Sequence, residues 1–144
     1  ATLQDDNELF VAVEANASYL VEVYVIASSV NPNFPASGNL GFRCLFAYPM
    51  GSSAQRARFG STSSTAGYTS RVDTAAQATA RAADNSATYI MSGDSSQHVL
   101  FETGVVLVGP TSGNIQFQFC MQSAAASQSA TRHAGSFMRV QRYV

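Results

Sequence analysis

The sequence predicts an all-β fold, an antiparallel β-sandwich or jelly roll of about eight strands, built as a single domain over residues 1–144. Apolar and polar side chains alternate with a period of two through most of the chain, as in half-buried strands. The alternating segments are rich in valine, tyrosine and phenylalanine, which favour strands, and they are separated by glycine, proline and asparagine. A chain of this length is expected to form one hydrophobic core.

The alternation and the residue types predict the extended segments from which these strands are built. They cover residues 8–13, 18–27, 40–48, 56–61, 68–72, 88–91, 98–108, 115–122 and 135–144. Residues 14–17 and 109–114 carry turn signals, and residues 31–38 and 123–134 are expected to be loops.

The segment 18–27 has no fully polar face. Tyr19, Val21, Val23 and Val25 lie in one phase, and Leu20, Glu22, Tyr24 and Ile26 lie in the other. Such a strand is either buried on both sides within one subunit or covered on its outer side by another subunit.

The middle third of the chain is the least determined. Residues 50–97 are rich in serine, alanine, threonine and glycine, with few large apolar side chains. The alanine-rich stretch 74–83 is expected to be a loop or a small-residue strand. A short helix is the alternative, although that helix would lack an apolar stripe to anchor it.

Composition and charge argue against two classes of partner. The charged residues make up 12% of the chain and the net charge is −1, so the surface lacks the positive charge that binds nucleic acid. No apolar run reaches the roughly 18 residues of a membrane span, and the first residues are acidic, unlike a signal peptide. We therefore expect neither nucleic acid nor membrane as a partner.

The two cysteines are predicted to be free thiols. Cys44 is in phase with Phe42 and Phe46, whereas Cys120 is in phase with the glutamines of its segment and opposite to Phe117 and Phe119. If both strands serve one core, the two sulfur atoms point to opposite sides of it, which prevents a disulfide.

No residue pattern indicates catalysis. The nearest hint of a nucleophile is Gly93-Asp94-Ser95-Ser96-Gln97-His98, which a polar turn explains better, and no Gly-x-Ser-x-Gly motif occurs. No pair of carboxylates has a spacing that indicates glycoside cleavage. We expect no enzymatic activity.

Metal and cofactor sites are not predicted either. The histidines and cysteines never approach ligand spacing, and the acidic run at residues 5–8 is explained by solvation before the first strand, with a calcium site as the weaker alternative. Three aromatic residues, Phe34, Tyr68 and Tyr89, are weak candidates for stacking on a sugar, with ordinary packing as the alternative.

Six residues are candidates for an oligomer interface because alternation places them on an outer face with too little charge for open water. They are Tyr24, Ile26, Gln116, Gln118, Phe137 and Tyr143.

Both ends of the chain resemble a domain of virion proteins from tailed bacteriophages that infect actinobacteria. The closing pattern is Gly104-Val105-Val106-Leu107-Val108-Gly109-Pro110-Thr111-Ser112-Gly113-Asn114-Ile115-Gln116-Phe117-Gln118-Phe119, then a Ser/Ala/Thr loop, then Ala134-Gly135-Ser136-Phe137-Met138-Arg139-Val140-Gln141-Arg142. The opening carries Leu-Gln-Asp-Asp-Asn-Glu-Leu at 3–9 and Glu-Ala-Asn-Ala-Ser-Tyr at 14–19. The resemblance covers about residues 3–48 and 99–143, and residues 50–97 are not matched.

The strand order also resembles the C1q/TNF-like jelly roll. Together these resemblances imply a non-enzymatic homotrimer on the virion, a capsid decoration or head-fibre protein that contacts the major capsid or tail protein. The alternative that they imply is a tail-fibre tip or receptor-binding domain that recognises a carbohydrate, a host glycan, on the cell surface.

Overall fold

The computed structural model describes residues 2–30, 40–61, 68–76, 87–91, 94–121 and 128–143, and it confirms the predicted β-sandwich. Ten strands occur in this part of the chain, against about eight expected. Their bounds are β1 Gln4–Val13, β2 Ser18–Val30, β3 Leu40–Ala47, β4 Ser53–Ser61, β5 Tyr68–Ala76, β6 Ala87–Met91, β7 His98–Leu107, β8 Gly113–Met121, β9 Ser129–Arg132 and β10 Phe137–Arg142.

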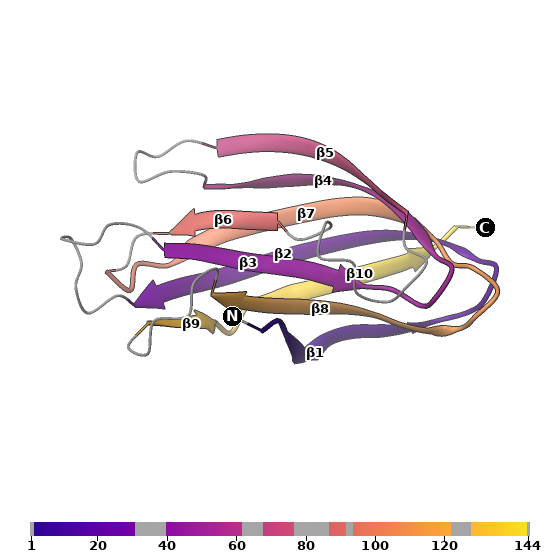
Figure 1. Cartoon of the computed structure of the whole chain (residues 1–144), viewed down its shortest axis with the longest axis horizontal. Coiled ribbons are helices and arrows are strands. Elements are labelled where there is room, and N and C mark those ends of the chain that lie inside the picture. Colours follow the sequence, from indigo (N-terminus) through magenta and orange to yellow (C-terminus); the bar gives the residue numbers. More distant parts are fainter. Residues whose placement is uncertain are drawn as a thin grey trace.

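The strands form two antiparallel sheets that run along the long axis of the molecule (Figure 1). Sheet A has the order β1-β8-β3-β6, and sheet B has the order β10-β2-β7-β4-β5, with β9 also paired to β2. The first eight strands therefore pair in a nested way: β1 with β8, β2 with β7, β3 with β6, and β4 with β5.

The core lies between the two sheets and is built from one phase of each strand. Val23 and Val25 of β2 are almost fully buried, as are Phe42 of β3 and Phe117 of β8. Phe46 and Phe117 meet edge to face with ring centroids 5.6 Å apart, an arrangement that aromatic rings favour. The period-two pattern of the sequence thus marks the core side of these strands correctly.

The turns after β1, β3 and β7 pack together at one end of the sandwich (Figure 1). The Asn16 backbone N–H donates to the Gly109 carbonyl oxygen at 2.8 Å. A Cβ at Gly109 would lie 2.5 Å from the Gly51 carbonyl oxygen, so the two backbones leave no room for a side chain there.

The middle third forms strands, as expected, although they are longer than the sequence indicated. β4 begins at Ser53, and β5 continues to Ala76, so the small-residue strand is correct for Thr74–Ala76. The rest of the stretch 74–83 lies outside the described residues.

β9 and β10 lie end to end along the same edge of β2. β10 pairs with residues 19–24 of β2, and β9 pairs with residues 27–30. Between them the chain turns at Gly135, whose φ of 91° favours glycine and whose Cβ position lies 3.2 Å from Ile26 Cδ1. The expected loop over residues 123–134 is therefore wrong for residues 129–132, where the segment Ser-Ala-Thr-Arg lacks the large apolar residues that mark a strand.

Both cysteines are free, as predicted, and both are buried. Cys44 belongs to the core, and Arg43, which faces the other way, is opposite Cys120 in the β3–β8 register. The two thiols therefore lie on opposite sides of sheet A.

An ion-pair cluster joins the edge strands of the two sheets. Arg132 of β9 pairs with Asp6 of β1 and also with Glu8, and the Asp6 side chain is only 3% exposed. Asp6 Oδ1 also accepts hydrogen bonds from the backbone N–H groups of Glu8 and Leu9, each with an N···O distance of 2.9 Å. The acidic run at residues 5–8 thus has a structural role. The explanation of this run by solvation before the first strand missed that role.

We predict that Arg132→Ala lowers the free energy of unfolding by about 2 kcal/mol or more, because it leaves the buried Asp6 carboxylate without its cation. Arg142→Ala is the matched control, since it breaks an exposed pair with Glu14 and should cost about 0.5 kcal/mol or less. Urea unfolding of both variants measures the difference. Equal losses would show that the cluster does not hold the two sheets together.

Candidate interaction surface

The outer face of sheet B carries most of the large apolar side chains that are exposed in the described part of the chain. We define this outer face by the outward residues of β10, β2 and β7, which register pairs place side by side. They are Phe137, Arg139 and Gln141 of β10 with Tyr143 just after it, Leu20, Glu22, Tyr24 and Ile26 of β2, and Val99, Phe101, Thr103, Val105 and Leu107 of β7.

Exposure supports this assignment. Seven large hydrophobic side chains are exposed among the described residues, and Val99, Leu107, Phe137 and Tyr143 are on this face, at 43%, 50%, 52% and 51% exposure. The Tyr143 N–H donates to the Ser18 carbonyl oxygen at 3.1 Å, which continues the β10–β2 pairing by one step. Four of the seven exposed apolar groups therefore gather on one surface, which is unusual for a free monomer.

An aromatic row crosses the middle of the outer face. The rings of Tyr24 and Phe137 stack with centroids 5.5 Å apart and planes 15° apart, and Phe101 is opposite Tyr24 in the β2–β7 register. Beside this row, Arg139 pairs with Glu22. Aromatic residues and arginine are the groups that most often dominate the energy of protein interfaces.

The two glutamines predicted to share this interface lie elsewhere. Gln116 and Gln118 belong to β8, so they face outward from sheet A, on the opposite side of the sandwich. Gln118 is 1% exposed and its Nε2 donates to Asp5 Oδ1, whereas the half-buried Gln116 donates to the Asp6 carbonyl oxygen at 3.3 Å. The six candidates therefore do not form one surface, because alternation separates inward from outward residues but does not say which sheet a strand joins.

The aromatic candidates for sugar binding also separate. Phe34 lies outside the described residues. Tyr68 begins β5, and its side chain is outside the described part. Tyr89 is 4% exposed in β6, and its hydroxyl donates to Glu102 Oε1 at 2.7 Å, so its ring offers no surface for a sugar.

Glu102 is a buried carboxylate in the core that the sequence analysis did not single out. It is 2% exposed and accepts hydrogen bonds from Tyr89 and from the Cys44 thiol, the latter at 3.4 Å. Because β7 belongs to sheet B and both donors belong to sheet A, this cluster links the two sheets. The available signal was its phase, since Glu102 lies in the same phase of β7 as Leu100 and Val106, which are core residues.

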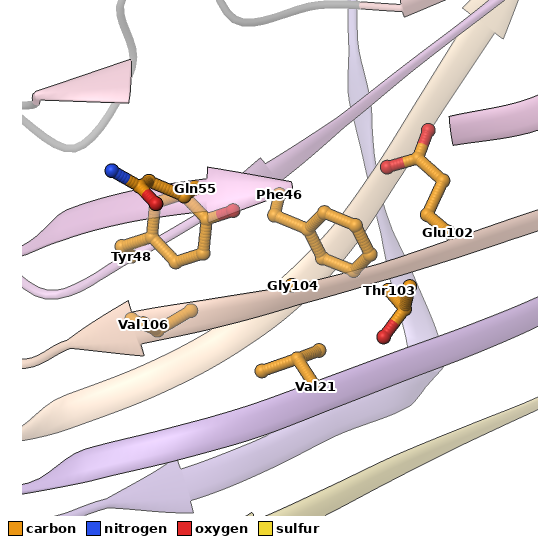
Figure 2. Close-up of a pocket in the computed structure, with 8 residues that line it drawn as sticks. All are labelled: Val21, Phe46, Tyr48, Gln55, Glu102, Thr103, Gly104 and Val106. Atoms are coloured by element: carbon orange, nitrogen blue, oxygen red, sulfur yellow. The ribbon is translucent and has the colours of Figure 1, made fainter. Parts of the chain in front are cut away.

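A small cavity of about 10 Å³ lies beside Glu102, where Gly104 leaves the strand without a side chain (Figure 2). Figure 2 shows Phe46 of β3, and Tyr48 just after this strand, over the cavity, with Val21 and Val106 on the other side. This volume accommodates about one water molecule and no larger ligand.

Of Ser95 and His98, the serine and histidine of the nearest hint of a nucleophile in the sequence, the Ser95 hydroxyl donates to the Asp94 carbonyl oxygen. Ser95 is exposed with a φ of 68°, and its N–H donates to the Ser29 carbonyl oxygen at 3.1 Å. A different pair, Ser28 Oγ and His133 Nε2, is 2.7 Å apart, but Ser28 is 5% exposed and no described carboxylate orients the imidazole. We take this pair to be a structural contact that fixes the turn after β9.

Within the described ranges no group of three or more histidine, cysteine, aspartate or glutamate side chains is arranged to hold a metal ion. In the same part of the chain no helix is long and apolar enough to cross a membrane. Comparison with known proteins finds no matching family model, no similar curated protein and no similar solved structure.

We predict that Tyr89→Phe lowers the free energy of unfolding by about 1–2 kcal/mol, because it removes a hydrogen bond to a buried carboxylate. Tyr143→Phe is the control, since Tyr143 is half exposed. Thermal and urea unfolding should leave the control unchanged. No loss in Tyr89→Phe would show that water replaces the hydroxyl at Glu102.

The free energy of unfolding is expected to depend on pH through the Cys120 thiol. Burial raises the pKa of this thiol above its ordinary value of 9.0, and the nearby Arg43 charge offsets part of the rise. The thiol therefore loses its proton at a lower pH in the unfolded chain than in the folded protein. Its contribution to the free energy of unfolding is complete below pH 9.0 and is lost as the pH rises above that value. Urea unfolding between about pH 8 and about pH 10 should show a smaller decline in Cys120→Ala than in the parent protein. Parallel declines would exclude the shift.

Proposed function

We propose that this chain is a non-enzymatic structural protein of a tailed-phage virion, displayed on the particle as a capsid decoration or head-fibre protein. In this proposal it acts as a homotrimer and contacts other virion proteins, the major capsid or a tail protein. Its role would be to form and hold contacts on the particle surface.

The outer face of sheet B is the observation that carries the proposal. A protein that works as a free monomer rarely leaves several large apolar side chains bare on one flat surface. Here Phe137 and Leu107 are about half exposed, and the stacked Tyr24 lies beside Phe137. Such a face is suited to contact with another protein.

The strand pairing supports a more specific fold assignment within this proposal, a jelly roll. In a jelly roll, one long hairpin is wrapped so that its strands pair from the outside inward, as β1 pairs with β8 and β4 with β5. We therefore propose a jelly roll of the C1q/TNF-like type. The threefold stoichiometry follows from that resemblance.

The low charge of the chain fits an exposed position on a particle. The charged residues make up 12% of the sequence, and the net charge is −1. Contacts made by apolar groups are not screened by salt, so an assembly held by them would keep its strength in media of different ionic strength.

We predict that the purified protein sediments as a trimer and binds to particles that lack it. Particles without the protein should still assemble and adsorb to cells, but they should be less resistant to heat and osmotic shock. Adding the purified protein should restore this resistance. Sedimentation equilibrium and plaque counts after shock measure both effects. A chain that binds host cell-wall carbohydrate, and whose loss prevents adsorption, would instead be a tail-fibre tip or receptor-binding domain.

A further inference from the structure

We propose that β5 pairs edge to edge with β5 of a second copy of this chain, in antiparallel orientation across a twofold axis at Val72. Sheet B of one copy then continues into sheet B of the other. This inference goes beyond the proposed function, because it concerns an edge of the sandwich rather than the outer face of sheet B and does not depend on a place in a virion.

The β5 strand is the last strand of sheet B (Figure 1). Within the described residues it pairs with β4 alone, so the backbone N–H and C=O groups along its other side have no strand beside them in that part of the chain. Its pairing with β4 runs from Tyr68 to Ala76 without a register shift, and the strand contains no proline. A regular edge of this kind is a template for a further strand.

The other strands at the ends of the two sheets are less suited to such pairing. β6 has five residues, and the pairing of β1 with β8 shifts between Asp5 and Phe10. β10 has six residues, and both of its charged residues are arginines. Short strands, register irregularities and charges of one sign protect an edge against pairing with its own copies. β5 is therefore the sheet edge of the described structure that best accepts a second copy.

The charged residues along the β5 register favour a carboxylate beside Arg71. Arg58 of β4 lies between Glu102 of β7 and Arg71 of β5, so two arginines are directly opposite each other. Like charges in this position destabilise a pair of strands. One step along the same phase, Arg56 is opposite Asp73. Arg71 is thus the charged position of β5 that faces a like charge within its own chain.

A second copy supplies the carboxylate. Arg71 and Asp73 flank Val72, so an antiparallel pair with its axis at Val72 places Arg71 of each copy opposite Asp73 of the other. In the resulting row, Asp73 of the second copy lies between Arg71 of the first copy and its own Arg56. A carboxylate has two oxygens and accepts hydrogen bonds from both neighbours.

The same charges select this one register and direction. A slip by one residue leaves Arg71 opposite an uncharged residue, and a parallel pair in register brings Arg71 to Arg71. In the antiparallel register at Val72, Ser70 also meets Thr74, a hydroxyl pair of the kind that adjacent strands favour. An unrelated strand without these charges would leave the charges of β5 without partners, so a second copy is the partner that fits.

Cysteine cross-linking of the full chain tests the register. In Val72→Cys the introduced thiols meet at the axis, where opposite Cα atoms are about 4.5 to about 5.5 Å apart, within the range of a disulfide. Mild oxidation should therefore give a covalent dimer on a non-reducing gel. Ser70→Cys is the matched control, because its two copies lie out of register and should not cross-link, whereas its mixture with Thr74→Cys should. The parent protein, whose two cysteines are buried, gives the background.

A charge-exchange experiment tests the contribution of Arg71 and Asp73. Arg71→Asp and Asp73→Arg should each associate at least about tenfold more weakly than the parent, because like charges then meet across the axis. An equimolar mixture should recover the parent mass in sedimentation equilibrium. Arg142→Asp is the control, since Arg142 is exposed in β10 and its reversal should leave the mass unchanged. Circular dichroism checks that each variant folds.

The outcomes separate this inference from the proposed function. Cross-linking of Val72→Cys, with recovery in both mixtures, supports the β5 contact even if the protein forms no trimer and never binds a virion. A trimer that Arg71→Asp does not change and that Val72→Cys does not cross-link overturns the β5 contact but supports the proposed assembly. A parent protein that is monomeric at high concentration overturns the β5 contact, and so does an association that the mixtures fail to restore.

Discussion

The structure depends on one constraint: in each central strand, alternate side chains must suit either the core between the sheets or the outer side of the sandwich. β2 shows this most fully: Val21, Val23 and Val25 are buried between the sheets, while Leu20, Tyr24 and Ile26 are half-buried on the outer side. A one-residue slip of this strand would exchange the two sets. The inner set fixes the core, so the outer set is free to serve another purpose, and its apolar character is the observation from which we propose an assembly role.

Polar groups inside the sandwich add specificity to that core. Glu102 receives hydrogen bonds from Tyr89 and Cys44 of the opposite sheet, and Asp6 holds Arg132 across the edge between β1 and β9. A buried carboxylate is costly unless its partners stand in the right place. These two clusters therefore favour one register between the sheets, which an apolar core alone would specify less strictly.

Much of the fold could be predicted from the sequence because alternation reports the inner and outer side of a strand. It placed Tyr24, Ile26, Phe137 and Tyr143 on an outer face and separated the two thiols. It could not assign Gln116 and Gln118 to the opposite face, because sheet membership depends on pairing between distant segments. It missed β9, whose small residues carry no pattern, and it missed Glu102 as a core residue because a lone carboxylate in an apolar phase is usually taken as exposed. Four of the six candidate interface residues therefore share one outer face, and the two glutamines lie on the other sheet.

The end-to-end arrangement of β9 and β10 along β2 has a consequence for synthesis. β2 is made early, yet one of its edges is completed only by residues 129–142. A nascent chain on the ribosome therefore carries the backbone donors and acceptors of that edge unpaired until almost all of this sequence has emerged. Exposed edges of this kind recruit other strands. Slow translation of the codons for residues 129–142 would prolong that vulnerable period, and a chaperone that shields β2 would be most useful then.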